Sequence, residues 1–371
     1  MRIDRVRIVR IPLHLVAPLR TSAGDHTSRT ATLVEVTADD GTVGWGENVA
    51  PEGSFYTGET AEVSYRHLRD VVVPALTADR DELDDDELEA EDMALASMPM
   101  AAHAFTSALA DVEARQRGVS LAKALGGSAG NVRVGVVVGL HDEIDDTVAQ
   151  CVARAAEGYT RVKVKIVPGT DVDTVREVRA ALPSAVELHV DANGAYDPSE
   201  PGRLAFLDGF GVGLLEQPFG PREIRAHAAL ARTISTPVCL DESVPDFAAA
   251  VEAISAGACS VINVKPSRVG GFHSAVAILA LCAKNGIGAW IGGMLESGIG
   301  RAGCLALATH PACTHTPDLS ASDRYFLGDV TVPFVLVDGH IAVPEGPGLG
   351  VAPRQELLVA AGTSIETVFG R

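Results

Sequence analysis

The 371-residue sequence is short of basic charge and lacks paired cysteines. It has 30 Lys and Arg residues but 49 Asp and Glu residues, which gives a net charge of −19 at pH 7. This surplus of negative charge argues against nucleic acids and anionic membranes as partners, because both attract basic surfaces. The six cysteines form no C-x-x-C pair and have no histidines at zinc-site spacing, so reduced, buried thiols are expected.

Long apolar runs are also missing. No stretch approaches the roughly 18 uncharged apolar residues of a membrane span. The first residues are interrupted by charges and by Pro12, so they lack the apolar core of a signal peptide. These absences predict a cytoplasmic protein without a membrane partner.

From about residue 131 onward, short strand-like apolar segments alternate with helical ones. The strand-like segments are residues 131–140, 161–167, 185–193, 211–218, 236–243, 260–267 and 288–295. Strand followed by helix, many times over, predicts parallel strands joined by right-handed crossovers. Seven or eight such units in a row favour a closed (β/α) barrel over a doubly wound sheet.

The beginning of the chain has a different pattern. Strand-like segments flank Asp39-Asp40-Gly41, which is typical of a hairpin turn, and a helical pattern follows from about residue 61. The sequence therefore predicts an α/β protein, a modified (β/α)7β TIM-type barrel with an α+β capping domain. The predicted parts are the cap over 1–125, the barrel over 126–322, and a C-terminal segment that packs on the cap over 323–371.

Charged residues recur near the ends of five consecutive strand segments, at intervals of 24 to 26 residues. In each segment the residues of opposite parity are aliphatic, so the charged side chain is expected to point into the barrel. Catalytic groups of such barrels lie at the carboxyl ends of the strands. The period therefore predicts one active site from Lys165, Asp191, Glu216, Asp241 and Lys265.

The chemistry of this set follows from its residue types. Three carboxylates without partnering histidines suit a hard divalent cation, Mg²⁺ or Mn²⁺. Lysines on both sides of the carboxylates predict proton transfer next to the carboxylate of a small substrate, through an enediolate. Lys163 and Arg268 are expected either to depress the pKa of a neighbouring amine or to pair with a carboxylate or carbonyl.

The motifs KVK, DAN, EQP, DES and NVKPSRVGG, at these intervals, resemble the enolase superfamily in its muconate-lactonizing-enzyme-like subgroup. GWGE in the cap and GGMLESGIGRA after the seventh strand extend the resemblance over nearly the whole chain. The most similar family is that of o-succinylbenzoate synthase and N-succinylamino acid (N-acylamino acid) racemase. The resemblance implies Asp191, Glu216 and Asp241 as metal ligands, Lys165 and Lys265 as acid and base, and Asn193 and Glu242 as neighbours of the metal.

Two activities are implied by this resemblance. One is the syn-dehydration of 2-succinyl-6-hydroxy-2,4-cyclohexadiene-1-carboxylate to o-succinylbenzoate, a menaquinone precursor; the other is racemisation of N-acylamino acids. Arg268 is at a position where racemase-competent members have arginine, so both stay open. Mandelate racemase chemistry is disfavoured because Lys265 replaces a histidine, and dipeptide epimerisation because the Asp-x-Asp motif is broken at Asp318 and Asp323.

Three functions beyond these two also stay open. Muconate cycloisomerase shares the lysines and carboxylates, whereas a Schiff-base aldolase and a non-catalytic, metal-dependent carboxylate-binding barrel belong to different classes of protein. Specificity is expected to come from two mobile cap loops, residues 18–29 and 50–60. Relatives in this family imply a homo-oligomer. The expected substrate contacts are Leu19, Ser22, Tyr56 and Met294.

Overall fold

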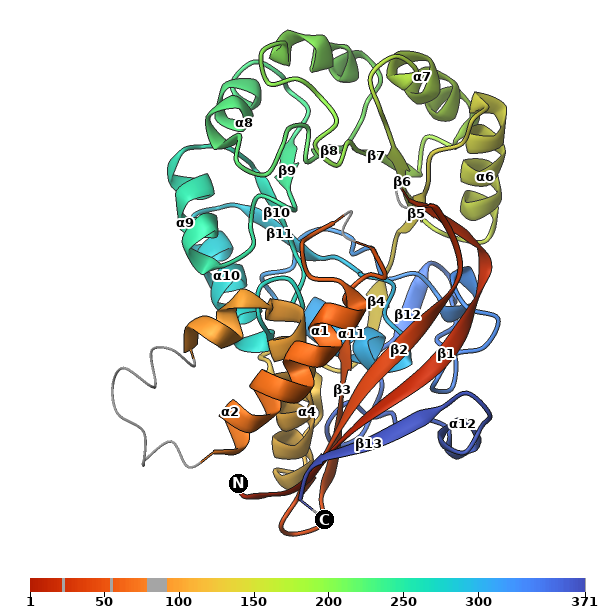
Figure 1. Ribbon diagram of the computed structural model, residues 1–371. Helices are drawn as coiled ribbons and strands as arrows, with labels where there is room; N and C mark the ends of the chain where they lie inside the picture. Colours follow the sequence, from red (N-terminus) through yellow and green to blue (C-terminus); the bar gives the residue numbers. More distant parts are fainter. Residues whose placement is uncertain (22–23, 54–55, 79–91, 371) are drawn as a thin grey trace.

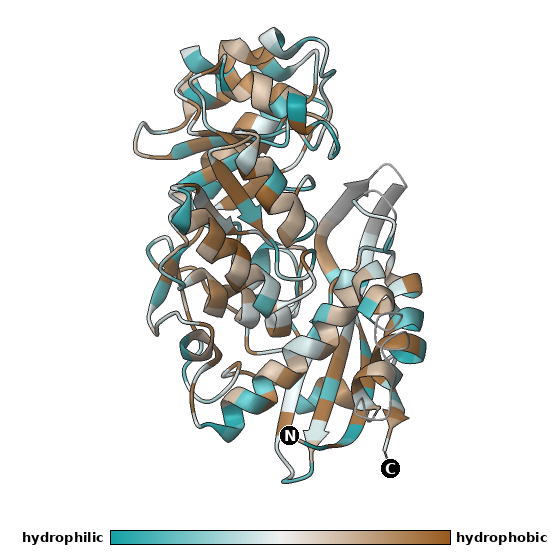
Figure 2. Ribbon diagram, turned by 90° about the vertical axis from the view of Figure 1, so that its left-hand side faces the viewer, coloured by the Kyte–Doolittle hydropathy of each residue, from teal (hydrophilic) through white to brown (hydrophobic). Residues whose placement is uncertain are grey.

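The computed structural model describes residues 1–21, 24–53, 56–78 and 92–370, with the backbone alone for residues 18–21 and 24–26. A cap and a barrel lie next to each other, and both chain termini are at the end of the cap sheet (Figures 1 and 2). Within these described ranges, no helix is long and apolar enough to cross a membrane.

The cap is an antiparallel sheet with helices on one face. The strand order is β13-β1-β2-β3, and the turn before β3 contains Gly41 with a φ of 81°. The strands are β1 Ile3–Thr21, β2 Gly24–Ala38, β3 Val43–Asn48 and β13 Ser364–Phe369. The helices are α1 Ala61–His67, η1 Leu68–Val72, α2 Val73–Thr77, α4 Pro99–Gln116 and, towards the barrel, α5 Leu121–Ala124.

Helix α4 packs directly against the sheet. Phe105 and Val112 of α4 are fully buried in one apolar cluster with Val6 of β1. The helix comes so close to β3 that a Cβ atom at Gly46 would lie 2.0 Å from the carbonyl oxygen of Ala104. Gly46, the second glycine of the GWGE motif, is therefore required by packing, because any side chain there would separate helix and strand.

The prediction of a loop over residues 18–29 is wrong for most of that range. Strands β1 and β2 continue as a hairpin, with Leu19 opposite His26 and Thr21 opposite Gly24. Alternation of apolar and polar residues reveals a strand only where one of its faces is buried. The far ends of β1 and β2 pair without such alternation, so the sequence did not reveal them as strands. The segment 50–60 does form a connection, between β3 and α1.

Seven parallel strands form the barrel wall in sequential order from β5 to β11 (Figure 1). They are β5 Val136–Val138, β6 Arg161–Lys165, β7 Glu187–Asp191, β8 Leu214–Glu216, β9 Val238–Leu240, β10 Val261–Val264 and β11 Gly288–Ile291. Residues 314–318 close the ring: Thr314 N–H donates to Ala289 of β11, and Gly135 N–H, just before β5, donates to Pro317. The barrel prediction is thereby confirmed, with an eighth segment that is not a regular strand.

Helices cover the outside of the wall. They are α6 Ile144–Ala156, α7 Asp171–Ala181, the 3-10 helix η3 Pro201–Gly209, α8 Ile224–Ala231, α9 Phe247–Ser255, α10 Phe272–Lys284 and α11 Gly298–Ala308. Val190 and Val264 belong to the large apolar cluster, whereas Leu214, Cys239 and Trp290 form a small separate one. The alternation therefore separates an outer aliphatic layer from an interior that also holds charged side chains.

Two terminal details differ from the expected pattern. Residues 131–140 form two strands, and between them Val134 and Gly135 donate their N–H groups to the carbonyls of Gly339 and Pro317. The buried Arg161 guanidinium lies beside Gly135, where a Cβ atom would lie 2.4 Å from Arg161 Nε. The first piece, β4 Asn131–Arg133, pairs with β12 His340–Ala342. The C-terminal part thus contacts both domains, since β13 pairs with β1 of the cap. It also contains η4 Ser322–Arg324 and α12 Gln355–Leu358.

Candidate active site

The five periodic residues meet at one end of the barrel. Lys165, Asp191 and Glu216 are the last residues of β6, β7 and β8, and Asp241 and Lys265 directly follow β9 and β10. Strand register sets Lys165 opposite Asp191, and Asp191 opposite Glu216. Parallel strands end at the same edge of a sheet, so one charged residue at the end of each strand is enough to build the cluster.

Lys165 is the more accessible of the two expected acid/base lysines. Its Nζ lies 2.6 Å from Asp191 Oδ2 and 2.5 Å from Asn193 Oδ1. Asn193 in turn donates to Glu242 Oε1 at 2.8 Å. The Lys165 side chain is 27% exposed, against 10% for Lys265. An ammonium group held by an aspartate, yet open on one side, can reach a substrate atom.

Lys265 lies on the other side of the carboxylates and contacts the cap. Its Nζ is 2.8 Å from Asp241 Oδ2 and 3.2 Å from the hydroxyl of Tyr56. The Tyr56 hydroxyl donates to Asp241 Oδ1 at 2.9 Å and accepts from Arg268 Nη1 at 3.0 Å. Arg268 also forms an ion pair with Asp241. Tyr56 thus reaches the strand ends from the cap, as its prediction as a substrate contact requires.

Lys163, one layer deeper, is surrounded by carboxylates. Its Nζ lies 2.6 Å from Glu216 Oε2, 2.5 Å from Asp318 Oδ2 and 3.3 Å from Asp191 Oδ2. Asp318 also pairs with Arg161, whose side chain is fully buried. This arrangement matches the structural role expected for Lys163, since its charge is neutralised by carboxylates rather than directed at another amine.

The charges in the cluster shift its pKa values strongly. Burial alone would lower the pKa of Lys163, but the carboxylates of Asp318, Glu216 and Asp191 outweigh it and raise that pKa. Burial likewise opposes, and Tyr56 and Glu242 favour, the ammonium form of Lys265, whose pKa is raised overall. Arg268 pairs with Asp241 and donates to the carbonyl oxygen of Val244, in line with the pairing role that was the other expectation for it; its effect on the pKa of Lys265 stays a prediction.

Three buried carboxylates are suited to a metal by their donor type. Asp191, Glu216 and Asp241 offer hard oxygen donors at the ends of successive strands and are at most 1% exposed. Two further buried oxygens, Glu242 Oε2 and Asn263 Oδ1, have no hydrogen-bond partner. In the described residues no three His, Cys, Asp or Glu side chains are grouped around one point, because each carboxylate accepts from a lysine. The donor type and the burial of these residues fit a divalent cation. The carboxylate oxygens that would bind it are the ones that now pair with lysines.

Backbone strain is concentrated at this rim. Asn193, Gln217 and Leu295 have φ values of 42°, 41° and 63°, in the left-handed region that residues other than glycine seldom adopt. Asn193 and Gln217 each follow a ligand strand by one or two residues. Such residues persist where surrounding contacts hold them, often at functional sites. Here the Gln217 side chain accepts from the backbone N–H groups of Asp241 and Ser243.

The remaining expected substrate contacts have different outcomes. Met294 is half-buried and follows Gly292 by two residues, and its N–H donates to Glu296 Oε1 at 2.6 Å. The side chain of Leu19 and the whole of Ser22 lie outside the described residues. Gly292, on the same segment as Met294, borders the site, since a Cβ atom there would lie 2.8 Å from Lys265 Cε.

Sequence reasoning missed two features of the site. Asp318 was considered only as part of a broken motif, although it lies on the closing segment and holds Lys163 and Arg161. Asp318 follows β11 by about one βα repeat, and this spacing could have revealed it as a residue of the eighth segment of the barrel. Residues 298–303, GIGRAG, also match the G-x-G-x-x-G pattern of phosphate-binding loops, but the protein's own carboxylates bind their amides.

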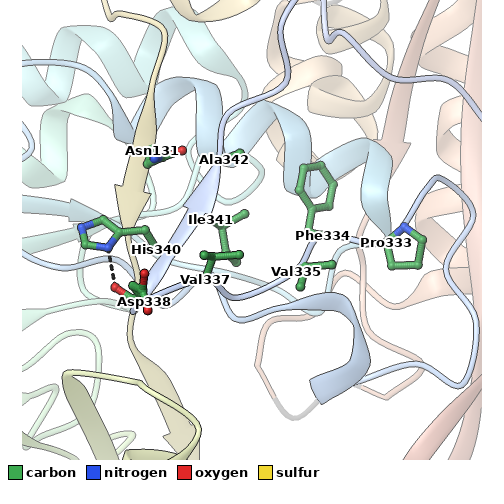
Figure 3. Close-up of a pocket in the computed structure, with 9 residues that line it drawn as sticks. All are labelled: Asn131, Pro333, Phe334, Val335, Val337, Asp338, His340, Ile341 and Ala342. Atoms are coloured by element: carbon green, nitrogen blue, oxygen red, sulfur yellow. Dashed lines mark hydrogen bonds between the residues drawn. The ribbon is translucent and has the colours of Figure 1, made fainter.

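One surface hollow of the described residues lies away from this site. A cavity of about 690 Å³ lies among the C-terminal loops and is lined by Asn131, Pro333, Phe334, Val335, Val337, Asp338, His340, Ile341 and Ala342 (Figure 3). His340 Nδ1 is hydrogen-bonded to the carbonyl of Asp338 at 2.7 Å. This mostly apolar lining holds none of the lysines or carboxylates at the strand ends, so it is not the site of their chemistry.

Comparison with known proteins gives consistent matches over both domains. The family model for the enolase C-terminal domain-like region matches residues 146–357, and the model for the mandelate racemase / muconate lactonizing enzyme N-terminal domain matches residues 3–126. An N-succinylamino acid racemase from Amycolatopsis sp is 42% identical over 368 residues, covering 96% of this chain and 97% of that protein. An o-succinylbenzoate synthase from Geobacillus kaustophilus is 39% identical, covering 94% and 93%.

Solved structures match equally completely. An enolase superfamily member from Enterococcus faecalis V583 superposes with a TM-score of 0.90 at 33% identity, covering 100% of both chains. An N-succinyl Arg/Lys racemase from Bacillus cereus has a TM-score of 0.87 at 22% identity and covers 99% of this chain and 100% of that one, a likeness of fold alone.

Proposed function

Since the chain belongs to the mandelate racemase / muconate lactonizing enzyme family of the enolase superfamily, we propose that it is an o-succinylbenzoate synthase that also racemises N-succinyl amino acids. The carrying observation is a pair of lysines at the two ends of one row of carboxylates. Lys165 is held by Asp191 on one side and Lys265 by Asp241 on the other. In this proposal the reacting substrate carbon lies between the two amines.

In the synthase reaction, Lys165 acts from its neutral amine form: its lone pair takes the proton alpha to the substrate carboxylate, and Lys165 becomes an ammonium group. The ammonium group of Lys265, held by Asp241 and Tyr56, stabilises the negative charge that develops on that carboxylate. Lys165 then returns the proton to the departing hydroxyl, which leaves as water from the same side. The greater exposure of the Lys165 side chain, 27% against 10% for Lys265, supports this role, because the base must meet the substrate.

Asp191, Glu216 and Asp241 are the residues that would hold Mg²⁺, or Mn²⁺, in this proposal. A bound divalent cation would supply positive charge beside the substrate carboxylate, which acidifies the neighbouring C–H bond, and would compete with the lysines for their carboxylate partners. Lys163 stays paired with Asp318 and keeps the floor of the site in place.

Racemisation is the second candidate, and one observation favours it. The two lysines approach from strands β6 and β10, on opposite sides of the carboxylates, as a two-base exchange at one carbon requires. One lysine would take the proton and the other would deliver a proton to the opposite face. The 42% identical relative named as an N-succinylamino acid racemase supports the same candidate.

Side-by-side rate assays test the proposal. The enzyme with Mg²⁺ receives the cyclohexadiene carboxylate and, separately, a panel of N-succinyl and N-acetyl amino acids, each with and without EDTA. Efficient dehydration, lost with EDTA and restored by Mg²⁺ or Mn²⁺, is the expected result. Racemisation alone would make the second candidate the main activity, and turnover of muconates alone would replace both. The homo-oligomer and the cytoplasmic location stay predictions.

A further inference from the structure

The first turn of helix α11 lacks a capping hydrogen bond from its own N-cap side chain. A helix begins with four backbone N–H groups that lack helical partners, and a serine at the N-cap normally accepts from one of them. Ser297 is the N-cap residue here, but its side chain accepts no such bond. Its hydroxyl instead donates to Glu47 Oε2 at 2.7 Å.

Glu47 belongs to the other domain, at the end of β3 in the cap. It accepts from Ser297 N–H and from Gly300 N–H, both at 2.9 Å, and its side chain is fully buried. Arg29 of β2 donates to Glu47 at 3.1 Å and also to the carbonyl of Leu295. The cap thus supplies both the acceptor for the helix start and a donor for the segment that precedes it.

The helix start is shaped to admit this carboxylate. A Cβ atom at Gly300 would lie 3.0 Å from Glu47 Oε2 and 2.9 Å from the Glu296 side chain, so only glycine allows the approach. Gly298 N–H donates to Asp329 at 2.7 Å. The amides of a phosphate-binding pattern are therefore occupied by carboxylates of the protein, and the positive end of the helix favours them.

The same segment forms the rim of the active site. Gly292 lies against Lys265, and Met294 and Leu295 follow it, Leu295 with its φ of 63°. Leu295 and Ser297 are the residues that the cap holds through Arg29 and Glu47. The position of the rim therefore depends on contacts that exist only while the cap is docked.

We propose that Glu47 is a positioning residue that couples docking of the cap to the conformation of residues 292–297, and so sets the fit of the substrate side chain. Its effect on substrate rests on the proposed function, whereas its effect on the segment does not. Loss of Glu47 leaves Ser297 and Gly300 without acceptors and frees the rim beside Met294. The reacting groups on β6 to β10 are untouched.

The test compares Glu47→Gln with Glu35→Gln in the full-length protein. Glu35 is also a buried cap carboxylate, at 2.5 Å from Arg7, but its ion-pair partners Arg5 and Arg7 both belong to β1 of the cap. A double variant, Arg29→Gln with Glu47→Gln, avoids leaving a lone buried charge. Amide hydrogen exchange across residues 294–301 and the separate KM and kcat values for two N-succinyl amino acids of different size are measured.

Exchange in 294–301 is expected to rise at least about tenfold in both Glu47 variants, equivalent to about 1.4 kcal/mol, and to stay unchanged in Glu35→Gln. KM is expected to rise about tenfold with kcat changed less than about threefold. Unchanged exchange in the Glu47 variants would overturn the proposal, as would raised exchange with unaltered KM and selectivity. If the wild type turns over no amino acid derivative, the racemase part of the proposed function fails, while the exchange measurement still decides the coupling.

Discussion

The barrel and the cap contribute to the active site in opposite ways. Barrel strands of 3 to 5 residues end in charged groups that neighbouring strands hold on both sides. The cap has strands of 19 and 15 residues, and its described residues that reach the site or its rim include Tyr56 of a loop and Arg29 and Glu47 of the sheet. The groups that do chemistry are thus fixed by the barrel, and those that adjust the pocket come from a separate domain.

The largest effect should come from the barrel. Lys165→Ala is expected to reduce dehydration and racemisation by about 10³-fold or more, because general acid–base catalysis by one group contributes up to about 10⁴-fold. Rates with Mg²⁺ and far-UV circular dichroism check the loss and the intact fold. The exposed Lys284→Ala is the control. A Lys165→Ala variant with near-normal turnover would remove the base role from this residue.

The floor of the barrel should be the next most sensitive. Asp318→Asn leaves Arg161 and Lys163 without their shared carboxylate, and breaking such a buried pair costs about 3–5 kcal/mol of unfolding free energy. Urea unfolding measures it. Asp173→Asn breaks an exposed pair with Arg176 and should cost less than about 1 kcal/mol. Equal losses in the two variants would show that the buried network adds nothing.

The pH dependence of the unfolding free energy tests the contact between the cap and the barrel at one cap histidine, His103. Burial lowers the pKa of His103 to about 4, and its ring packs edge-on against Phe272 of the barrel. A depressed pKa means that the unfolded state binds the proton first, so this stability is present above about pH 6.5 and is lost as pH falls towards 4. Between pH 7 and 5 the loss is about 2 kcal/mol.

His103→Gln removes that ionisation, so its unfolding free energy should fall about 2 kcal/mol less over the same pH interval than that of the wild type. Urea unfolding at both pH values gives the comparison. His273→Gln, at an exposed position, should keep the wild-type pH dependence. Identical slopes for wild type and His103→Gln would contradict a neutral, buried His103.

The smallest effect should come from the cap side of the site. Tyr56→Phe removes the hydroxyl between Asp241 and Lys265, and kcat/KM is expected to fall about tenfold, or about 1.4 kcal/mol. Steady-state kinetics measures it, with Tyr65→Phe, whose hydroxyl bonds Glu366 elsewhere on the cap, as the control. A loss as large as that of Lys165→Ala would erase the division between the domains.

The same division explains what the sequence could predict. Asp191, Glu216 and Asp241 were found because alternation and a repeat of about 25 residues mark the strand ends of a barrel. Asp318 was not found as a partner of Lys163, because the closing segment forms no regular strand and shows no alternation. Glu47 was missed because its partners, Ser297 and Gly300, are about 250 residues away and no local pattern reports such a contact.

The central claim, two lysines acting on opposite sides of one carbon, is tested most directly by proton exchange in D2O. Each enantiomer of an N-succinyl amino acid is incubated with enzyme and Mg²⁺, and loss of the α-proton signal is followed by NMR. Wild type should exchange both enantiomers, Lys165→Ala only one, and Lys265→Ala only the other. Exchange of both enantiomers by either variant, or none by the wild type, would contradict the account.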